Sequence, residues 1–99
     1  MTIEEYFSQW EGYTADEIAN ILRWKGIKGC RMNKCFCPIA IDLRRETQVI
    51  GCVVLEKRTE KPNGERVRHS EELEKFIRLF DANTYPDLKD TRPLNTDIK

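Results

Sequence analysis

Hydrophobic residues recur at helical spacing in four stretches of the chain and form a nearly continuous run between the third and the fourth. The helical stretches cover about residues 2–10, 14–25 and 38–46, and a last one begins after Ser70 and stops near Asn83. The last stretch is the most regular, because its apolar residues fall at i, i+3, i+4 and i+7: Leu73, Phe76, Ile77 and Phe80. The pattern therefore predicts a protein built mainly from amphipathic helices.

The ends of the predicted helices carry capping signals. Thr14 is followed three residues later by Glu17, the arrangement of a capping box, and Gly26 supplies the left-handed residue that commonly ends a helix. Cys37 precedes Pro38, whose preset φ and missing amide suit the first position of a helix. The sequence thus indicates where the second and third helices begin.

The continuous apolar run indicates a sheet. Residues 49–55 are rich in β-branched side chains, which predicts a strand covered on both faces. Asn63-Gly64 is typical of a tight hairpin turn, and the alternating polar residues 65–68 after it predict an edge strand. We expect a small single α+β domain over residues 1–90, with three N-terminal helices, a β-hairpin and a C-terminal helix, and a frayed polar tail over residues 91–99.

Composition narrows the class of protein without naming a partner. The chain has 99 residues, of which 39% are hydrophobic and 34% charged, and its formal net charge is zero. These values fit one ordinary globular domain and exclude a disordered or strongly basic nucleic-acid-binding chain. The first 22 residues hold no base, and no apolar run approaches the roughly 20 residues that span a bilayer. We expect a cytoplasmic protein with no membrane contact.

Charge is nevertheless segregated, because residues 23–34 carry five bases and no acid. Together with two aromatic residues, these bases form the candidate binding residues: Arg23, Trp24, Lys25, Lys28, Arg31, Lys34 and Phe36. Such a set can bind an acidic protein surface. It also has the phosphate-contacting cations and stacking rings of a nucleic-acid-binding surface.

The four cysteines follow the spacing C-x4-C-x-C-x14-C, at Cys30, Cys35, Cys37 and Cys52. Four thiols could hold tetrahedral zinc or an iron–sulfur cluster, although the paired C-x-x-C spacing of zinc knuckles is missing. Alternatively they are reduced thiols that line the core or a loop. His69, the single histidine, could replace one ligand, but its place just before a helix cap favours a solvated or capping role.

Cys37 is also a candidate reactive thiol. It stands at a predicted helix start with Arg31 and Lys34 nearby, and both features stabilise a thiolate. A nucleophilic cysteine also needs an oriented base, and one histidine about thirty residues downstream is thin support for one. No complete catalytic constellation is present in the sequence, so we expect that the protein is not an enzyme.

Several short motifs resemble those of a family of small, functionally uncharacterised bacterial proteins. The shared order is GIKG from Gly26, CPxA from Cys37, and FDxxxYPxL from Phe80, within about residues 14–88. The resemblance implies no reaction, cofactor or catalytic residue. The chain departs from the family at Cys30, where an aliphatic residue is expected, and at Asp42, where an aromatic one is expected. A role for Cys30 as an obligatory metal ligand is therefore in doubt.

These observations favour a small non-enzymatic regulatory or protein-interaction module that uses the basic, cysteine-containing segment 23–40 to bind an acidic protein surface. Two alternatives use the same segment. One is a zinc- or iron–sulfur-dependent nucleic-acid-binding domain, and the other is a thiol-based redox sensor or enzyme.

Overall fold

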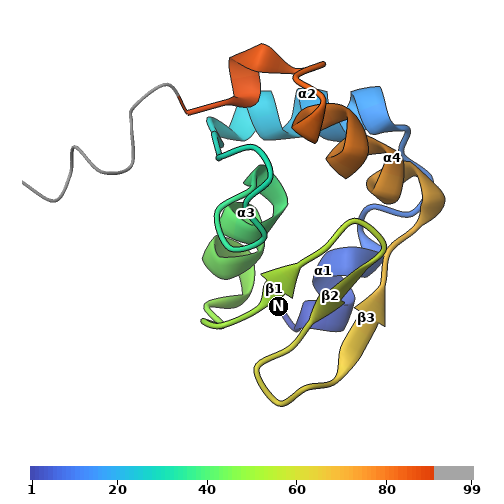
Figure 1. Cartoon of the computed structure of the whole chain (residues 1–99). Coiled ribbons are helices and arrows are strands. Elements are labelled where there is room, and N and C mark those ends of the chain that lie inside the picture. The colour runs from blue at the N-terminus through green and yellow to red at the C-terminus, as the bar shows by residue number, and fades with distance from the viewer. Residues whose placement is uncertain (91–99) are drawn as a thin grey trace, which may run out of the picture.

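The computed structural model describes residues 1–90. In this part of the chain, four α-helices, a three-stranded antiparallel sheet and a short 3-10 helix follow one another (Figure 1). In order they are α1 (Ile3–Ser8), α2 (Ala15–Lys25), α3 (Pro38–Thr47), β1 (Val53–Val54), β2 (Arg58–Glu60), β3 (Arg66–Arg68), α4 (Glu71–Asp81) and η1 (Pro86–Leu88). The predicted α+β class is confirmed, and the predicted tail lies outside the described residues.

The predicted helix starts are confirmed by their caps. Thr2 and Thr14 each form a complete capping box with the glutamate three residues later. Cys37 Sγ and Ser70 Oγ accept hydrogen bonds from backbone amides in the first turns of α3 and α4, at 3.4 and 3.2 Å. Gly26 ends α2 in the left-handed conformation, with φ of 75°. Local sequence signals therefore set the ends of these helices.

The prediction of a long strand with both faces covered over residues 49–55 is wrong. β1 has two residues and lies at an edge of the sheet, in the order β1-β2-β3. Gln48 and Gly51 have φ values of 60° and 95°, so the backbone turns twice before it becomes extended, and Ile50 is 78% exposed. Some apolar residues of this run are buried, such as Val54, whereas others are exposed, such as Ile50. Their spacing in the sequence does not show which residues are buried.

The predicted hairpin is confirmed around Asn63-Gly64. β2 and β3 pair antiparallel, and Thr59 lies opposite Val67. Gly64 has φ of 89° and its amide donates to the carbonyl of Lys61 at 2.9 Å. As predicted, the second strand of the hairpin is an edge strand.

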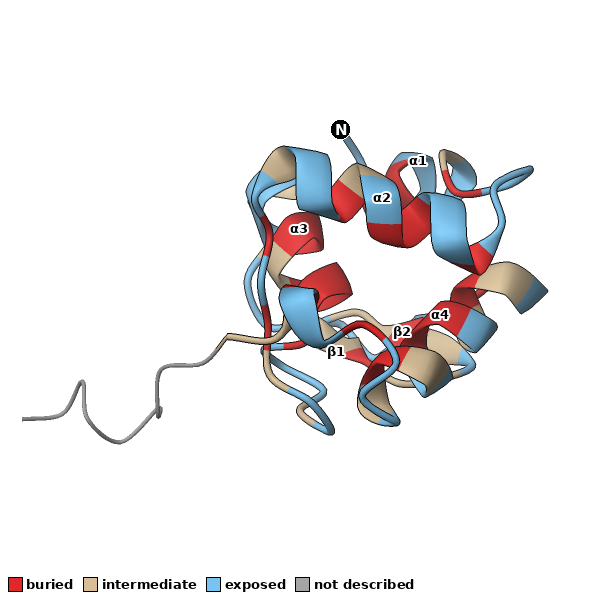
Figure 2. Cartoon of the chain, turned by 90° about the horizontal axis from the view of Figure 1, so that it is seen from above, coloured by how far each residue is buried: buried red, intermediate tan, exposed pale blue. Residues whose placement is uncertain are grey.

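The core lies between the helices and the sheet. Figure 2 shows the buried parts of α2, α3 and α4 turned toward the centre of the molecule, with exposed residues outside. All four apolar residues of the predicted α4 stripe are buried. Tyr85 stacks on Phe76 with 5.4 Å between ring centroids, and Leu88 is 1% exposed, so the segment after α4 closes one side of the core.

Within residues 1–90, no helix combines the length and the apolar character that crossing a bilayer requires.

Candidate interaction site

The bend that joins α2 to α3 is built into the fold. The amide of Gly29 donates to the carbonyl of Leu88, and the amide of Asp90 donates to the carbonyl of Gly29, each at 2.9 Å. The amide of Cys30 donates to the carbonyl of Phe36 at 2.8 Å and closes the loop between them. Figure 1 shows the C-terminal segment running along this bend. The first part of the predicted binding segment therefore holds the C-terminal part of the chain in place.

Gly29 permits this arrangement because it has no side chain. A Cβ at this position would lie 2.5 Å from the nitrogen of Pro38 and 2.6 Å from the carbonyl oxygen of Phe36. Both atoms belong to the backbone and cannot rotate away as a flexible side chain would. The two limbs of the bend can approach each other only with glycine here.

Three of the five predicted binding cations are engaged by other parts of the chain. Arg23 pairs with Asp87, and its Nη2 lies 3.2 Å from Oδ1 of that residue. Lys25 lies 2.8 Å from the buried carboxylate of Asp42, and Arg31 donates to the backbone carbonyl of Asp81 at 2.9 and 2.7 Å. The predicted basic face over residues 23–40 therefore has three of its five cations engaged by long-range partners in the same chain.

The remaining predicted binding residues are all exposed: Lys28, Lys34, Trp24 and Phe36. Lys28 and Lys34 have exposed side chains, and neither forms an ion pair with a described residue. Trp24 is 88% exposed, and its ring has no aromatic or cationic partner within residues 1–90. Phe36 is 42% exposed and contacts Arg44 of α3. Phe36 is thus a predicted binding residue whose ring contacts an exposed cation outside the predicted set, Arg44.

The cysteines are free thiols with different surroundings. Cys35 is exposed, Cys37 is buried, and Cys30 and Cys52 are half-buried. Among the described residues, no three histidine, cysteine, aspartate or glutamate side chains come together as metal ligands. The residues present therefore do not fit the zinc or iron–sulfur centre that the cysteine spacing suggested.

The surroundings of Cys37 oppose the reactive thiol predicted there. Its side chain is 4% exposed, and burial raises the pKa of the thiol to about 11, although hydrogen bonds from the amides of Ala40 and Ile39 act in the opposite direction. The helix N-terminus that should stabilise the thiolate is thus outweighed by desolvation. Cys37 caps α3 and fills the core, and these surroundings disfavour the candidate reactive thiol.

His69 is not solvated, contrary to expectation, but 5% exposed. Its Nδ1 lies 2.9 Å from the carbonyl oxygen of Glu56, its Nε2 lies 2.7 Å from Oγ1 of Thr59, and its ring stacks on Phe7. Burial lowers the pKa of the imidazole, against the raising effect of the hydrogen bond to Glu56. With both nitrogens engaged, His69 connects β2 and the segment before it to α1 and has no free nitrogen for a metal.

A surface that the sequence analysis missed lies on the C-terminal half of α3. Arg44, Arg45, Gln48 and Ile50 line an open hollow of about 460 Å³. The guanidinium carbon of Arg44 lies 5.7 Å from the centroid of the Phe36 ring. We call these five residues the α3 surface. The adjacent arginines in the last turn of a predicted helix, with an isoleucine soon after, are the sequence signal that could have indicated it.

A second hollow, of about 480 Å³, lies between the loop before α3, β1 and α4. Its lining includes Glu56 and Asp81, but both carboxylates have other contacts. Asp81 Oδ1 accepts from the amide of Met32 at 2.8 Å, and Glu56 lies 3.8 Å from Arg78. This hollow therefore offers no pair of free carboxylates for acid–base chemistry.

Comparison with protein-family models, with curated proteins and with solved structures finds no match for this chain. The resemblance to small bacterial proteins through the GIKG, CPxA and FDxxxYPxL motifs therefore stays a prediction.

Proposed function

We propose that this chain is a small, non-enzymatic regulatory module of the cytoplasm that binds an acidic segment of another protein through the α3 surface. One observation carries the proposal. Arg44 and Arg45 form no ion pair with any described acid, and they lie beside the exposed side chain of Ile50. By contrast, Arg23 and Arg31, on either side of Gly26, contact Asp87 and the carbonyl of Asp81 in the same chain.

The chemistry of the α3 surface suits a peptide with carboxylates around an apolar side chain. Arginine binds carboxylates through two parallel hydrogen bonds, which gives both affinity and orientation. Ile50 at 78% and Phe36 at 42% exposure offer apolar area that a partner would remove from water. Arginine and aromatic residues are also the types enriched at the centres of protein interfaces.

The local backbone explains why the side chain of Ile50 is exposed. Gln48 ends α3 with a left-handed φ of 60°, and Gly51 has φ of 95°. Ile50 stands between these two turns and is held away from the core, although the residues on either side of it, Val49 and Gly51, line a smaller cavity. A partner therefore meets a fixed turn, with little ordering entropy to overcome.

Nucleic acid is a weaker candidate for the same surface. Binding to nucleic acid commonly draws on about six to ten phosphate contacts, and the net formal charge of the whole chain is zero. The α3 surface supplies two cations. These numbers favour an acidic protein segment as the partner.

The test uses a short fluorescent peptide in which glutamates flank leucine and phenylalanine. We expect the full chain to bind it, with backbone amide shifts in the nuclear magnetic resonance spectrum centred on Arg44, Arg45 and Ile50. Replacing both arginines, as Arg44→Gln with Arg45→Gln, should weaken binding about tenfold or more, since each charge-assisted contact contributes strongly.

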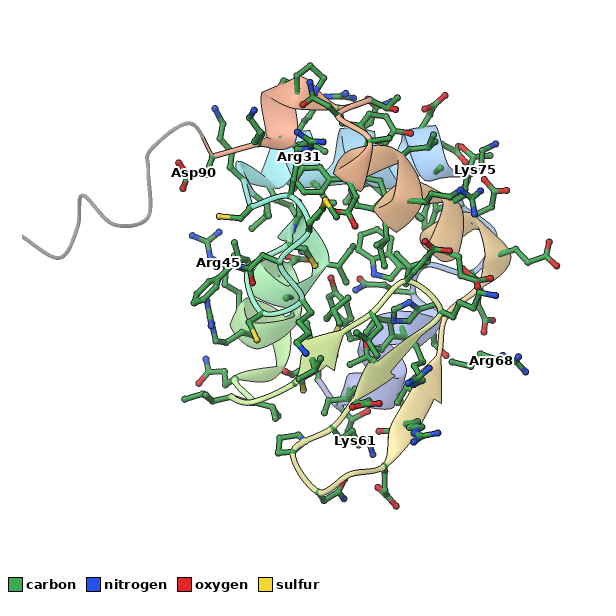
Figure 3. The ribbon with its side chains drawn as sticks, viewed as in Figure 1. Arg31, Arg45, Lys61, Arg68, Lys75 and Asp90 are labelled. Carbon is green, nitrogen blue, oxygen red and sulfur yellow. The ribbon has the colours of Figure 1, made fainter. Side chains whose placement is uncertain are left out.

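The matched control is Arg68→Gln with Lys75→Gln, which removes the same charge from the opposite side of the molecule (Figure 3). Both residues are exposed and neither forms an ion pair with a described residue. Equal weakening by the control pair would show a nonspecific charge effect and overturn the proposal. Tighter binding of a single-stranded RNA than of the peptide would also overturn it.

A further inference from the structure

Two cysteines that are distant in sequence line one small cavity. The cavity has a volume of about 20 Å³ and lies against α3, where Leu43 and Arg44 form part of its wall. Cys35 reaches it from the loop before α3, and Cys52 reaches it from the segment before β1. A space of this size holds about one water molecule, and both cysteines contribute to its wall.

A backbone hydrogen bond holds the two segments together. The amide of Val54 donates to the carbonyl of Lys34 at 2.9 Å, one residue before Cys35 and two residues after Cys52. The loop that carries Cys35 is stabilised by Asn33, whose Oδ1 accepts from the amide of Cys35 at 3.0 Å. The two segments that carry Cys35 and Cys52 are therefore held side by side by the fold itself.

The other two cysteines are less suited to pair with Cys35. Cys37 shares the larger hollow with Cys35, but its thiol is buried, and its sulfur accepts the hydrogen bond from Ala40 that caps α3. Cys30 lines neither cavity, and its amide closes the loop on Phe36. Cys35 is exposed and can meet an oxidant from solvent.

We propose that Cys35 and Cys52 form a reversible intramolecular disulfide when the protein meets a peroxide. The thiolate sulfur of Cys35 attacks one peroxide oxygen, the O–O bond breaks, and Cys35 becomes a sulfenic acid as water leaves. The sulfur of Cys52 then attacks the sulfur of Cys35, the S–O bond breaks, and the oxygen departs as a second water. In total, two thiols lose two hydrogens and are oxidised, while hydrogen peroxide is reduced to two waters.

A disulfide needs Cα atoms about 4.4–6.8 Å apart. Forming the bond therefore requires the loop before α3 to close on the segment before β1 across the cavity that both residues line. The disulfide would fix the loop before α3 to the segment before β1, next to Arg44. This inference concerns the chain alone and does not rest on the proposed interaction surface.

The test treats the reduced full chain with limiting hydrogen peroxide, blocks the remaining thiols after unfolding, and maps the tryptic peptides by mass. Trypsin separates the cysteines into residues 29–31, 35–44 and 46–57. We expect the last two peptides to be linked with the loss of two hydrogens, and fragmentation within the first of these to place the bond at Cys35 and not at Cys37. A thiol reductant should restore both free peptides.

Matched variants make the result decisive. Cys30→Ala should leave the linked product unchanged, whereas Cys52→Ala should abolish it and leave Cys35 as a sulfenic acid that a dimedone reagent traps. Linkage of Cys35 to Cys30 or to Cys37 would overturn the proposal. A wild-type product that is free of any intramolecular link, or that is linked only between molecules, would also overturn it.

Discussion

The ammonium of Lys25 lies 2.8 Å from Oδ1 of Asp42, a carboxylate with no solvent exposure in the middle of α3. The phenol of Tyr6 donates to Oδ2 of the same carboxylate at 2.8 Å, so both oxygens have partners. α1, α2 and α3 therefore meet at one buried charge. Burial, with the negative charge of Asp42 as a second cause, raises the pKa of Tyr6 well above its ordinary value.

Removing the cation of this group should destabilise the fold strongly. Lys25→Met leaves the carboxylate of Asp42 buried without its counter-ion, and we expect a loss of about 3 kcal/mol in the free energy of unfolding, measured by urea titration. Arg23→Met is the control, because its ion pair with Asp87 is exposed and should contribute less than about 1 kcal/mol. Equal losses in the two variants would contradict this account of the buried pair.

The stability of the protein should fall when His69 becomes protonated. Burial lowers its pKa below the unfolded value of 6.5, so the unfolded chain binds a proton more readily than the folded one. The contribution of neutral His69 to the free energy of unfolding is thus fully present above about pH 6.5. This contribution is lost as the pH falls from there toward the lowered pKa of the folded state. Urea unfolding at a series of pH values on both sides of this point measures the effect.

His69→Gln provides the control for this pH dependence. The variant loses the stacking on Phe7 and is less stable overall, but it should lack the change in stability just below about pH 6.5. The carboxylate of Glu5 has a pKa lowered from 4.5 by hydrogen bonds to Thr2, so its titration falls outside this window. An unchanged slope in the variant would show that another group is responsible.

The thiol of Cys37 should be nearly inert toward alkylation. With its pKa raised to about 11, its thiolate fraction near neutrality is roughly 300-fold below that of a free cysteine, whose pKa is about 8.5, and the side chain is also shielded. Iodoacetamide followed by peptide mapping should modify exposed Cys35 first and Cys37 only with global unfolding. Rapid labelling of Cys37 in the native protein would restore the reactive-thiol hypothesis.

A side chain at position 29 should open the bend. Gly29→Ala places a methyl group about 2.5 Å from backbone atoms of the following loop, and overpacking of this kind costs about 1–3 kcal/mol or more. Gly26→Asn is the comparison, because asparagine tolerates the left-handed φ of 75° and a Cβ there meets no atom within 4 Å. Thermal unfolding should show a much larger drop for Gly29→Ala, and similar drops would contradict the steric argument.

Local chemistry allowed much of the fold to be predicted. The capping box at Thr14, the cysteine–proline start of α3 and the glycine turn at Gly64 each act over a few residues, and the structure confirms all three. The strand over residues 49–55 failed because hydrophobicity does not show whether a residue faces the core or solvent. Ile50 illustrates this, since it is an exposed isoleucine inside an apolar run.

The site was harder to predict than the fold because its charges find partners far away in the sequence. Arg23 and Asp87 are separated by 64 residues, and Arg31 reaches Asp81 across 50. A run of bases therefore looks like an open surface in the sequence even when tertiary contacts occupy it. The two arginines of the α3 surface lie instead in the last turn of α3, where the helix dipole alone would have explained them.

The contact between Gly29 and the segment around Leu88 also bears on how the protein is made. During synthesis the N-terminal helices leave the ribosome first, at about 5–20 residues per second. The amide and the carbonyl of Gly29 have no hydrogen-bonding partner until Leu88 and Asp90 have emerged as well. Tyr85, which stacks on Phe76, emerges equally late. Completion of the native structure must therefore wait until the nascent chain has exposed its residues up to Asp90.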